Sequence, residues 1–331
     1  MPMSGIVHSG TTLRTPPTPP GSPRAGTVGA QRAGPRRRAR LAGDVAGVAP
    51  AAVLYTFLLV APAAVALLLS FFSWNGVSAF RWAGLANWDR LFHDGGAAHS
   101  LLLTIVVTAV SWFLQTVLSM AAGLTTARPT KVNSALSALY VLPLLISTAG
   151  IGLIWESLLA PSLGGMAFLA GTFHLGILNK DWLGDPSIVL YVITVIVAWQ
   201  FVPFYTLLYR TARQQVPRTL YEAAAIDGAT GFQAFRHVTL PQLRNTIASS
   251  SVLVVIGTLT YFDMFFLLTD GGPGTSSRVL SLDMYNEAFS STDFGYASVL
   301  TIVLVLIGIS AGAVLLKVAR FSASARAHGG E

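Results

Sequence analysis

Residues 296–318, YASVLTIVLVLIGISAGAVLLKV, form an apolar run whose one charged residue, Lys317, stands next to its end. A hydrocarbon core about 30 Å thick is crossed by roughly 20 apolar residues in a helix, so this run is long enough to span a membrane. Five further apolar runs lie near residues 51–73, 101–127, 135–159, 187–209 and 246–268. The sequence therefore predicts an all-α, polytopic membrane protein with six transmembrane helices.

The composition excludes an ordinary soluble domain. Of the 331 residues, 53% are hydrophobic and only 11% are charged, and the mean hydropathy is +0.62. There is no cysteine, which excludes disulfides, thiolate catalysis and cysteine metal sites. We expect no catalytic residue, no metal site and no cofactor.

The positions of the basic residues predict the orientation. An even number of spans places both termini on one side of the membrane. If that side is the cytoplasm, only four of the 21 Lys and Arg residues fall in outer loops, namely Arg81, Arg90, Lys180 and Arg278. Basic residues favour cytoplasmic loops, so we predict an inner (plasma) membrane protein with cytoplasmic N- and C-termini. The formal charge of +7 then reflects topology and not a nucleic-acid partner.

The ends of the chain differ from its centre. Residues 1–45 are rich in Thr, Pro, Gly and Arg and contain too little apolar surface to offset the entropy of ordering. We expect a disordered cytoplasmic tail, then a six-helix transmembrane domain over residues 46–320, then a short cytoplasmic tail over 321–331. The cluster Arg36–Arg40 stands just before the first span, where each basic residue near anionic membrane lipid contributes about 1 kcal/mol.

The loop 210–245 contains Glu222-Ala223-Ala224-Ala225-Ile226-Asp227-Gly228-Ala229 and, further on, Leu240-Pro241. Pro217 suits a first helical position and Gly228 the position after a helix end. This predicts a helix from Pro217 to Asp227, roughly 16 Å long, with a small apolar side and a sharp reversal at Gly228. Thr230 and Gln233 have capping-box spacing, which predicts a second short helix that Leu240-Pro241 ends. By periodicity alone, an interfacial helix that touches only lipid headgroups fits equally well.

The phrase Glu-Ala-Ala-x-x-Asp-Gly-Ala at 222–229, followed by Val238-Thr239-Leu240-Pro241, resembles the cytoplasmic coupling motif of ABC-importer permeases. Three loop segments, Gly84–Phe92, Asn179–Pro186 and Thr269–Pro273, resemble the carbohydrate branch of that family, which includes the maltose and glycerol-phosphate type. The resemblance implies that the chain docks onto a separate ATPase through a coupling motif made of Glu222, Ala223, Ala224, Asp227, Gly228, Leu240 and Pro241.

The resemblance also implies a set of partners. They are a dimer of cytoplasmic ABC ATPases, a second permease subunit in what we expect to be a heterodimer, and an extracytoplasmic solute-binding protein. The implied mechanism is alternating access, with a carbohydrate as the expected solute. An importer of another polar solute, such as a glycerol phosphodiester or a polyamine, and an ATP-independent carrier remain as alternatives.

The chain lacks the residues of an ATPase. A phosphate-binding loop needs Gly-x-x-x-x-Gly-Lys-Ser/Thr, and none of the three lysines, Lys131, Lys180 and Lys317, stands in such a setting. The histidines between the first and last spans all fall in predicted loops, which disfavours a membrane hydrolase with a paired nucleophile and base. We therefore predict a transport subunit and not an enzyme.

Polar residues inside predicted spans mark a possible solute pathway, because charge within a membrane is rare and usually functional. Asp263 and Tyr261 lie in the fifth run, and Trp199 and Gln200 lie in the fourth. Carboxylates, amides and aromatic faces suit sugar hydroxyls and rings. The alternatives are a hydrogen bond from Asp263 to a neighbouring helix and ordinary packing of Trp199. Glu156, near the outer end of the third run, is expected to reach the membrane interface.

Overall fold

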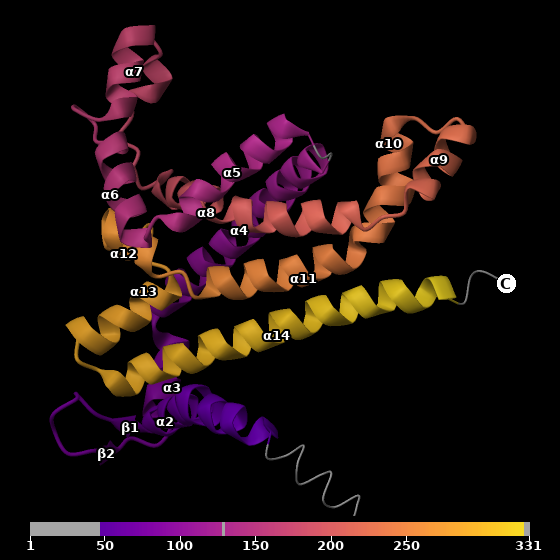
Figure 1. The fold of residues 1–331 in the computed structure, drawn as a ribbon. Coiled ribbons are helices and arrows are strands. Elements are labelled where there is room, and N and C mark those ends of the chain that lie inside the picture. Colours follow the sequence, from indigo (N-terminus) through magenta and orange to yellow (C-terminus); the bar gives the residue numbers. More distant parts are fainter. Residues whose placement is uncertain (1–46, 128–129, 328–331) are drawn as a thin grey trace, which may run out of the picture. The chain divides into compact units, whose positions relative to one another are not determined.

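The computed structural model describes residues 47–127 and 130–327. The chain divides into two compact units, residues 1–57 and 58–331, and the packing described below is that of the second. The elements follow one another along the chain (Figure 1) as η1 Thr56–Val60, α2 Ala61–Leu69, β1 Phe72–Ser73, β2 Arg81–Trp82, α3 Ala86–His93, α4 Gly95–Thr126, α5 Lys131–Leu145, α6 Thr148–Leu159, α7 Gly165–Phe173, η2 Gly176–Leu178, α8 Val189–Gln214, α9 Arg218–Ile226, α10 Gly231–Ala234, η3 Phe235–Thr239, α11 Leu240–Leu259, α12 Asp263–Thr269, α13 Leu280–Tyr285, η4 Asn286–Ser290 and α14 Phe294–Ala327.

Four helices are long and apolar enough to cross a membrane, namely Gly47–Leu69, α4, α8 and the Phe294–Lys317 part of α14. Two helix pairs pass the same test together although each pair is bent, by 98° between α5 and α6 and by 44° between Gly231–Leu259 and α12. The described residues thus contain four candidate spans, or up to six if each bent pair is one span. The apolar runs 135–159 and 246–268 are each divided into two helices, which the apolar pattern does not indicate.

Local backbone chemistry explains the first of these breaks. Pro143 stands in the last turn of α5, and Ile146 after it has an extended backbone. Ser147 then caps α6, because its hydroxyl accepts a hydrogen bond from the Gly150 N–H at 3.2 Å. A Ser in this position supplies one of the acceptors that a helix start otherwise lacks. A second helix can therefore begin inside a single apolar run.

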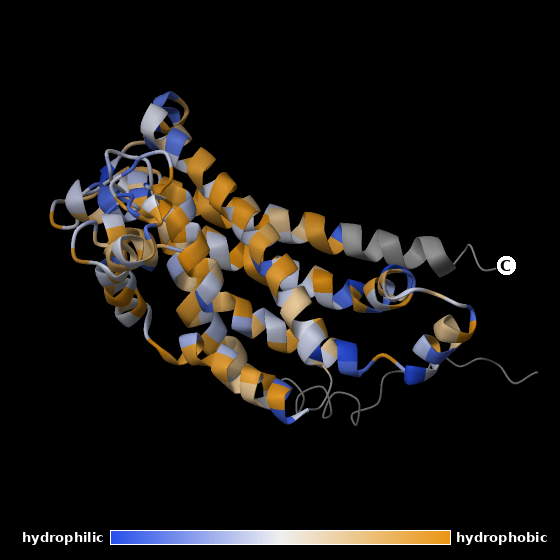
Figure 2. Ribbon diagram, turned by 90° about the horizontal axis from the view of Figure 1, so that it is seen from above, coloured by the Kyte–Doolittle hydropathy of each residue, from blue (hydrophilic) through white to orange (hydrophobic). Residues whose placement is uncertain are grey.

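The helix α4 packs against α8 and α11 through a face of small and polar side chains. At Gly123, an added Cβ atom would lie 2.8 Å from Tyr209 Cβ and 2.9 Å from the Thr206 carbonyl oxygen. Small residues allow two membrane helices to approach this closely. Figure 2 shows hydrophobic residues along the helices and hydrophilic ones gathered in the loops and helix ends.

The strands β1 and β2 form a short antiparallel pair that aligns Phe72 with Trp82 and Ser73 with Arg81. The prediction of an all-α fold does not include this two-stranded sheet. The start of α14 packs tightly against this segment. The Phe294 N–H donates to the Trp74 carbonyl oxygen at 3.0 Å, and a Cβ atom on Gly295 would lie inside van der Waals contact of the Phe72 carbonyl oxygen. The β1–β2 pair and α13 lie at one end of the helices, and α9 and α10 lie at the opposite end (Figure 1).

Candidate functional site

The first helix of the loop 210–245 is α9, Arg218–Ile226. It is one residue shorter at each end than the predicted helix from Pro217 to Asp227. Pro217 is the N-cap and not the first helical residue, because its ψ of 135° is extended. Asp227 is the C-cap, with ψ near 0°. The ring of Pro217 fixes φ alone, so ψ at this position is decided by the turn that leaves α8.

The reversal at Gly228 is confirmed. Its φ is +75°, a conformation that residues with a side chain rarely adopt. The Ala229 N–H donates to the Ala224 carbonyl oxygen at 2.9 Å and the Gly228 N–H to the Ala225 carbonyl oxygen at 3.1 Å, which closes the end of α9 as a left-handed cap does. A Cβ atom on Gly228 would contact nothing within 4 Å, so the backbone conformation alone requires glycine.

The predicted capping box is also confirmed. The Thr230 hydroxyl accepts from the Gln233 N–H at 3.3 Å, and Gln233 Oε1 accepts from the Thr230 N–H at 2.7 Å. The prediction that Leu240-Pro241 ends this second helix is wrong. The chain continues from α10 through the π-helical turn η3 directly into α11, with Pro241 in its first turn. The missing N–H of a proline is harmless there.

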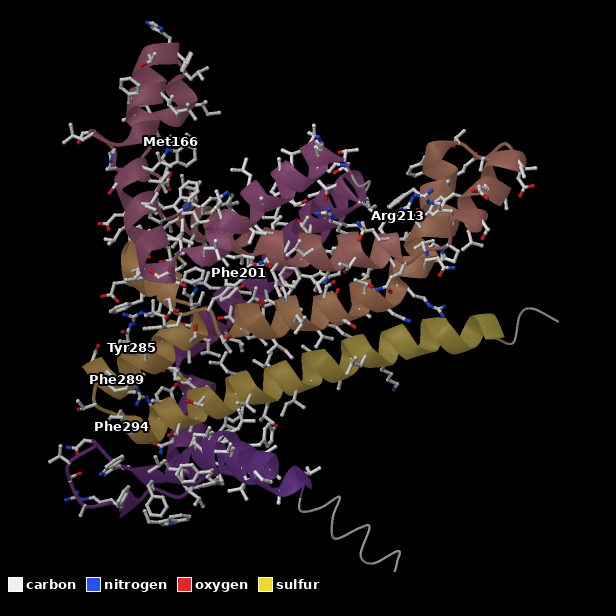
Figure 3. The ribbon with its side chains drawn as sticks, in the orientation of Figure 1. Met166, Phe201, Arg213, Tyr285, Phe289 and Phe294 are labelled. Carbon is white, nitrogen blue, oxygen red and sulfur yellow. The ribbon has the colours of Figure 1, made fainter. Side chains whose placement is uncertain are left out.

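We call residues 217–239 the α9–α10 hairpin. Two contacts hold its base: the guanidinium of Arg213 lies 4.0 Å from the centre of the Tyr221 ring, and Tyr221 Oη is 2.9 Å from Thr239 Oγ1. Figure 3 labels Arg213 at the end of α8, beside this base.

The motif residues of the α9–α10 hairpin are mostly at its surface. The exposed ones are Glu222, Ala223, Asp227 and Gly228, and Ala224 is half-buried. Two large apolar side chains at the tip are also exposed, Ile226 by 86% and Phe232 by 70%. Sequence reasoning missed these two residues, although apolar side chains in an otherwise polar loop are a usable signal for a partner surface.

The four predicted pathway residues do not form one pocket. Trp199 lines an apolar pocket of about 610 Å³ between α4, α5 and α8 that includes none of the other three, and its ring contacts Trp155 edge-to-face at 5.6 Å. Gln200 is buried. Tyr261 stacks on Phe201 at 5.3 Å in the break between α11 and α12.

Asp263, the first residue of α12, is exposed. Among the described residues it has no hydrogen bond or ion pair, so the alternative of a hydrogen bond to a neighbouring helix is not observed there. Glu156 is likewise exposed on α6.

Sequence reasoning missed a polar stripe within α4. The buried side-chain atoms that lack a hydrogen-bond partner within residues 47–127 and 130–327 include both amide atoms of Gln115 and the Ser111 hydroxyl. The Gln200 Oε1 atom of α8 belongs to the same group. Buried polar groups without partners are costly and are expected where water or a polar solute supplies the missing bonds. The four-residue spacing of Ser111, Gln115 and Ser119 on an apolar helix is the signal in the sequence.

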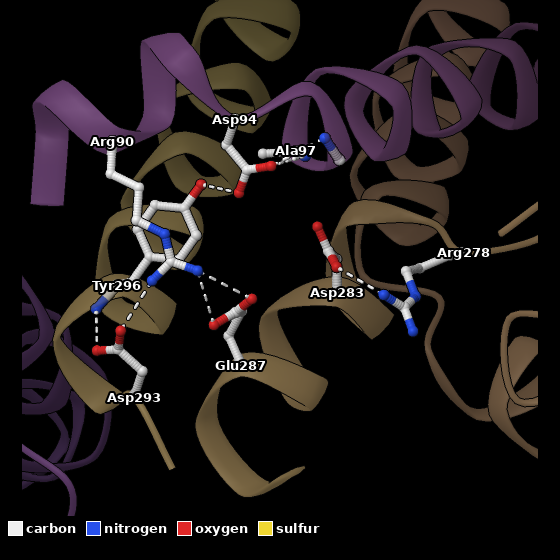
Figure 4. Close-up of polar contacts among 9 residues, drawn as sticks. Arg90, Asp94, Ala97, Arg278, Asp283, Glu287, Asp293 and Tyr296 are labelled. Atoms are coloured by element: carbon white, nitrogen blue, oxygen red, sulfur yellow. Dashed lines mark hydrogen bonds and ion pairs between the residues drawn. The ribbon is translucent and has the colours of Figure 1, made fainter. Parts of the chain in front are cut away.

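At the opposite end, five residues form what we call the charged cluster: Arg90, Asp94, Glu287, Asp293 and Tyr296 (Figure 4). Arg90 lies 2.8 Å from Asp293 Oδ2 and 3.3 Å from Glu287 Oε1, and its guanidinium lies 3.7 Å from the centre of the Tyr296 ring. Tyr296 Oη donates to Asp94 Oδ2 at 2.7 Å. The charged cluster thus joins α3, α4, η4 and α14.

The carboxyl groups at this end differ in their electrostatics. Burial opposes the ionisation of Asp94, but hydrogen bonds from Tyr296 Oη and from the N–H groups of Ala97 and Gly96 outweigh it and lower its pKa. Burial raises the pKa of Glu287 in spite of Arg90, and burial likewise raises the pKa of Asp283, which lies 3.8 Å from Arg278. Of these three carboxyl groups, Asp94 is the one whose surroundings lower its pKa.

Comparison with known proteins identifies the family. Residues 119–320 match the model of the family described as the binding-protein-dependent transport system inner membrane component. The chain belongs to this family. The match begins near the end of α4 and ends within α14, so it covers the α9–α10 hairpin with the predicted coupling motif. It also includes the loop segments Asn179–Pro186 and Thr269–Pro273, whereas Gly84–Phe92 lies before it.

Curated permeases agree with this assignment, and one solved structure has a similar fold. The chain is 32% identical to the probable ABC transporter permease protein YurN of Bacillus subtilis over 271 residues, 81% of this chain and 92% of that protein. It is 32% identical to the trehalose/maltose transport system permease protein MalF of Thermococcus litoralis, over 72% of this chain and 80% of that one. A bacterial ABC transporter involved in the import of alginate has a similarly folded chain, with a TM-score of 0.74 at 20% identity, covering 85% of this chain and 98% of that one.

The permease is therefore the inner-membrane component of an ABC transport system that works with a binding protein. Its relatives are named as permease proteins, in agreement with the prediction of a transport subunit whose ATP hydrolysis is carried out by a separate chain.

Proposed function

We propose that this permease carries a carbohydrate across the inner membrane as a subunit of an ATP-driven importer, with solute delivered by an extracytoplasmic binding protein. The proposal is supported by the names of its relatives. Besides the trehalose/maltose permease, they include the sulfoquinovosyl glycerol permease SmoG of Agrobacterium fabrum and the diacetylchitobiose permease NgcF of Streptomyces coelicolor, at 28% and 29% identity.

The exposed α9–α10 hairpin is the observation that carries the docking role. In the proposal, Glu222, Ala223, Ala224, Asp227 and Gly228 contact the ATPase. Leu240 and Pro241 act differently, because they stand at the junction of η3 and α11 and join the hairpin to that helix. The contacts of Tyr221 with Arg213 and Thr239 would pass a movement of α9 to α8 and α11.

The proposed topology has six spans, two of them broken, with both termini in the cytoplasm. The permease domain would extend over residues 46–320, between the two predicted cytoplasmic tails. The first tail, 1–45, lies outside the described residues, and α14 continues to Ala327 within the second. This arrangement places the α9–α10 hairpin inside and the charged cluster outside. It agrees with the excess of Lys and Arg in the inner regions. Reporter fusions at the β1–β2 pair and at the tip of the α9–α10 hairpin test it, and the same side for both would contradict it.

For the solute pathway we propose the break between α11 and α12, where Tyr261 and the exposed Asp263 lie, together with the polar atoms of Gln200 and Gln115. Trp199 is a weaker candidate, since its pocket is apolar. A second permease subunit, which we expect to be a different chain, would complete the pathway.

Co-purification tests the proposal most directly. The full chain, tagged at its C-terminus, would be extracted from native membranes and its companions identified by mass spectrometry. An ATPase and a second permease-like chain are expected. Recovery of the chain alone, also after crosslinking in intact membranes, would contradict the proposal and favour an ATP-independent carrier. Competition of uptake by polyamines or glycerol phosphodiesters, and not by sugars, would overturn the carbohydrate assignment alone.

A further inference from the structure

A pocket of about 740 Å³ lies at the base of the α9–α10 hairpin. The last turn of α4 contributes Leu124, the end of α8 and the turn after it contribute Arg213 and Val216, and α9 contributes Arg218, Tyr221 and Glu222. Its volume falls within the range of about 300–1,000 Å³ that is typical of small-molecule sites. Glu222 belongs to the predicted coupling motif and the Arg213–Tyr221 contact holds the base of the hairpin, but neither role accounts for the hollow itself or for Arg218.

The pocket lies at the level where two candidate spans end. Leu124 is two residues before the end of α4, and Arg213 is one residue before the end of α8. The Gln214 side-chain amide donates to the Ala127 carbonyl oxygen at 3.1 Å, which holds these two helix ends together. Under the proposed topology, the pocket therefore stands at the cytoplasmic ends of two spans, which is the level of lipid headgroups.

Two guanidinium groups face this space without an acidic partner. Neither Arg213 nor Arg218 forms an ion pair in the part of the chain that the structure describes, and the half-buried Arg213 is held against the face of the Tyr221 ring. Glu222 is the one carboxylate in the lining, so the pocket keeps a net positive charge. Planar guanidinium groups bind phosphate oxygens in a bidentate manner.

We infer that this pocket binds the phosphate headgroup of an anionic glycerophospholipid of the inner leaflet. The phosphate lies between Arg213 of α8 and Arg218 of α9, and the glycerol and upper acyl carbons lie along Leu124 and Val216. Basic pockets between the cytoplasmic ends of membrane helices are suited to such headgroups. The bound lipid bridges α8 and α9, so the position of the hairpin depends on the lipid composition of the membrane. The choice of the inner leaflet rests on the topology under Proposed function.

A soluble phosphate would share the two arginines but not the contact with Leu124 and Val216. The lipid is favoured because the pocket stands at the ends of two candidate spans, where headgroups and upper acyl carbons are already present. Leu124 and the buried Val216 give the pocket an apolar floor. This difference allows an experiment to separate the two sources of phosphate.

The test is native mass spectrometry of the full chain, purified with its co-purifying partners and stripped of lipid. Phosphatidylglycerol and phosphatidylcholine are added back separately. Phosphatidylglycerol is expected to bind selectively, and Arg213→Gln and Arg218→Gln are each expected to weaken its binding about fivefold. Arg236→Gln is the matched control, because Arg236 is an exposed residue of the same hairpin that is not part of the pocket lining. Thermal unfolding of the three variants checks that each is folded.

The inference would be overturned by equal binding of the two lipids or by unchanged binding in both pocket variants. An equal loss in Arg236→Gln, or displacement of the lipid by glycerol phosphate at the same concentration, would overturn it as well. Phosphatidylglycerol that binds the isolated chain but not the assembled complex would also overturn it, since the pocket would then belong to a partner. The readout needs no transport, so a failed carbohydrate assignment leaves it intact. Phosphatidylglycerol at these arginines with the hairpin outside the cell would refute the topology and the choice of leaflet, and would leave the lipid pocket itself intact.

Discussion

The α9–α10 hairpin and the charged cluster lie at opposite ends of the helices and are built in opposite ways. The hairpin leaves its tip free, with Ile226 and Phe232 exposed and Asp227 without an ion pair among the residues described. The charged cluster joins its own members: Arg90 has two carboxylate partners and a ring, and Asp94 accepts from Tyr296 and two N–H groups.

This difference indicates which surface is prepared for a partner. Exposed apolar side chains in a polar setting mark interaction surfaces, and a surface whose charges are already satisfied gains less from a new contact. The hairpin therefore resembles one half of an interface, whereas the charged cluster resembles a structural joint. Substitutions at the hairpin should change transport, and substitutions around the charged cluster should change stability.

The largest effect is expected at the hairpin. Gly228→Val should reduce uptake to background while the protein remains in the membrane in normal amount. The φ of +75° at this position costs a residue with a side chain about 1–2 kcal/mol. Relief of this strain would change the direction in which the chain leaves α9. Gly231→Val is the matched control, because Gly231 is also exposed in the hairpin but has no positive φ. Normal uptake by the Gly228 variant would remove the hairpin from the mechanism.

The second effect is expected next to the charged cluster, at the close approach of α14 to the Phe72 carbonyl. Gly295→Ala should destabilise the protein by about 3 kcal/mol, the upper part of the usual range for overpacking, since the backbone on the other side cannot rotate away. In Gly308→Ala, the new Cβ would lie 3.7 Å from Leu259 Cδ1, an ordinary contact, so little change is expected. Thermal unfolding in detergent measures the stability of the two variants. Similar midpoints would show that the contact between Gly295 and the Phe72 carbonyl is not tightly packed.

The smallest effect concerns pH. The lowered pKa of Asp94 means that its contribution to stability is present above the usual Asp value of 3.8 and is lost as the pH falls through the lower folded value. Burial raises the pKa of Asp283. Stability therefore falls as the pH rises from the usual Asp value of 3.8 towards the higher pKa of the folded protein. Asp94→Asn should reduce the loss of stability on acidification below about pH 4. Asp283→Asn should reduce the loss of stability as the pH rises above that value. Unfolding midpoints against pH give both slopes, and identical profiles in the two variants would contradict these assignments.

Local chemistry made part of the hairpin predictable. The capping box depends on Thr230 and Gln233 alone, and the turn at Gly228 depends on one residue's freedom to adopt a positive φ, so both followed from the sequence. The junction at Pro241 did not. A proline ends a helix or begins one depending on the path of the chain before it, and here that path is a π-helical turn into α11.

The candidate pathway was less predictable than the coupling motif. Polarity within an apolar run singles out Asp263 and Gln200, but it does not tell which side chains share a space. Trp199 and Gln200 are neighbours in sequence and face different surroundings, an apolar pocket and a buried interior. The unpartnered groups of Gln115 and Ser111 on α4 became visible only when the helices were packed together.

The sequence by itself determined that the chain is a helical membrane protein of the binding-protein-dependent permease family. Hydrophobic length and local motifs carry that information, because they act within one segment of the chain. Only the tertiary structure decided where two apolar runs break, which charges pair across the ends of α3, α4 and α14, and that α4, α8 and α9 enclose a basic pocket. These features depend on contacts between residues that are far apart in the sequence, and no local pattern specifies them.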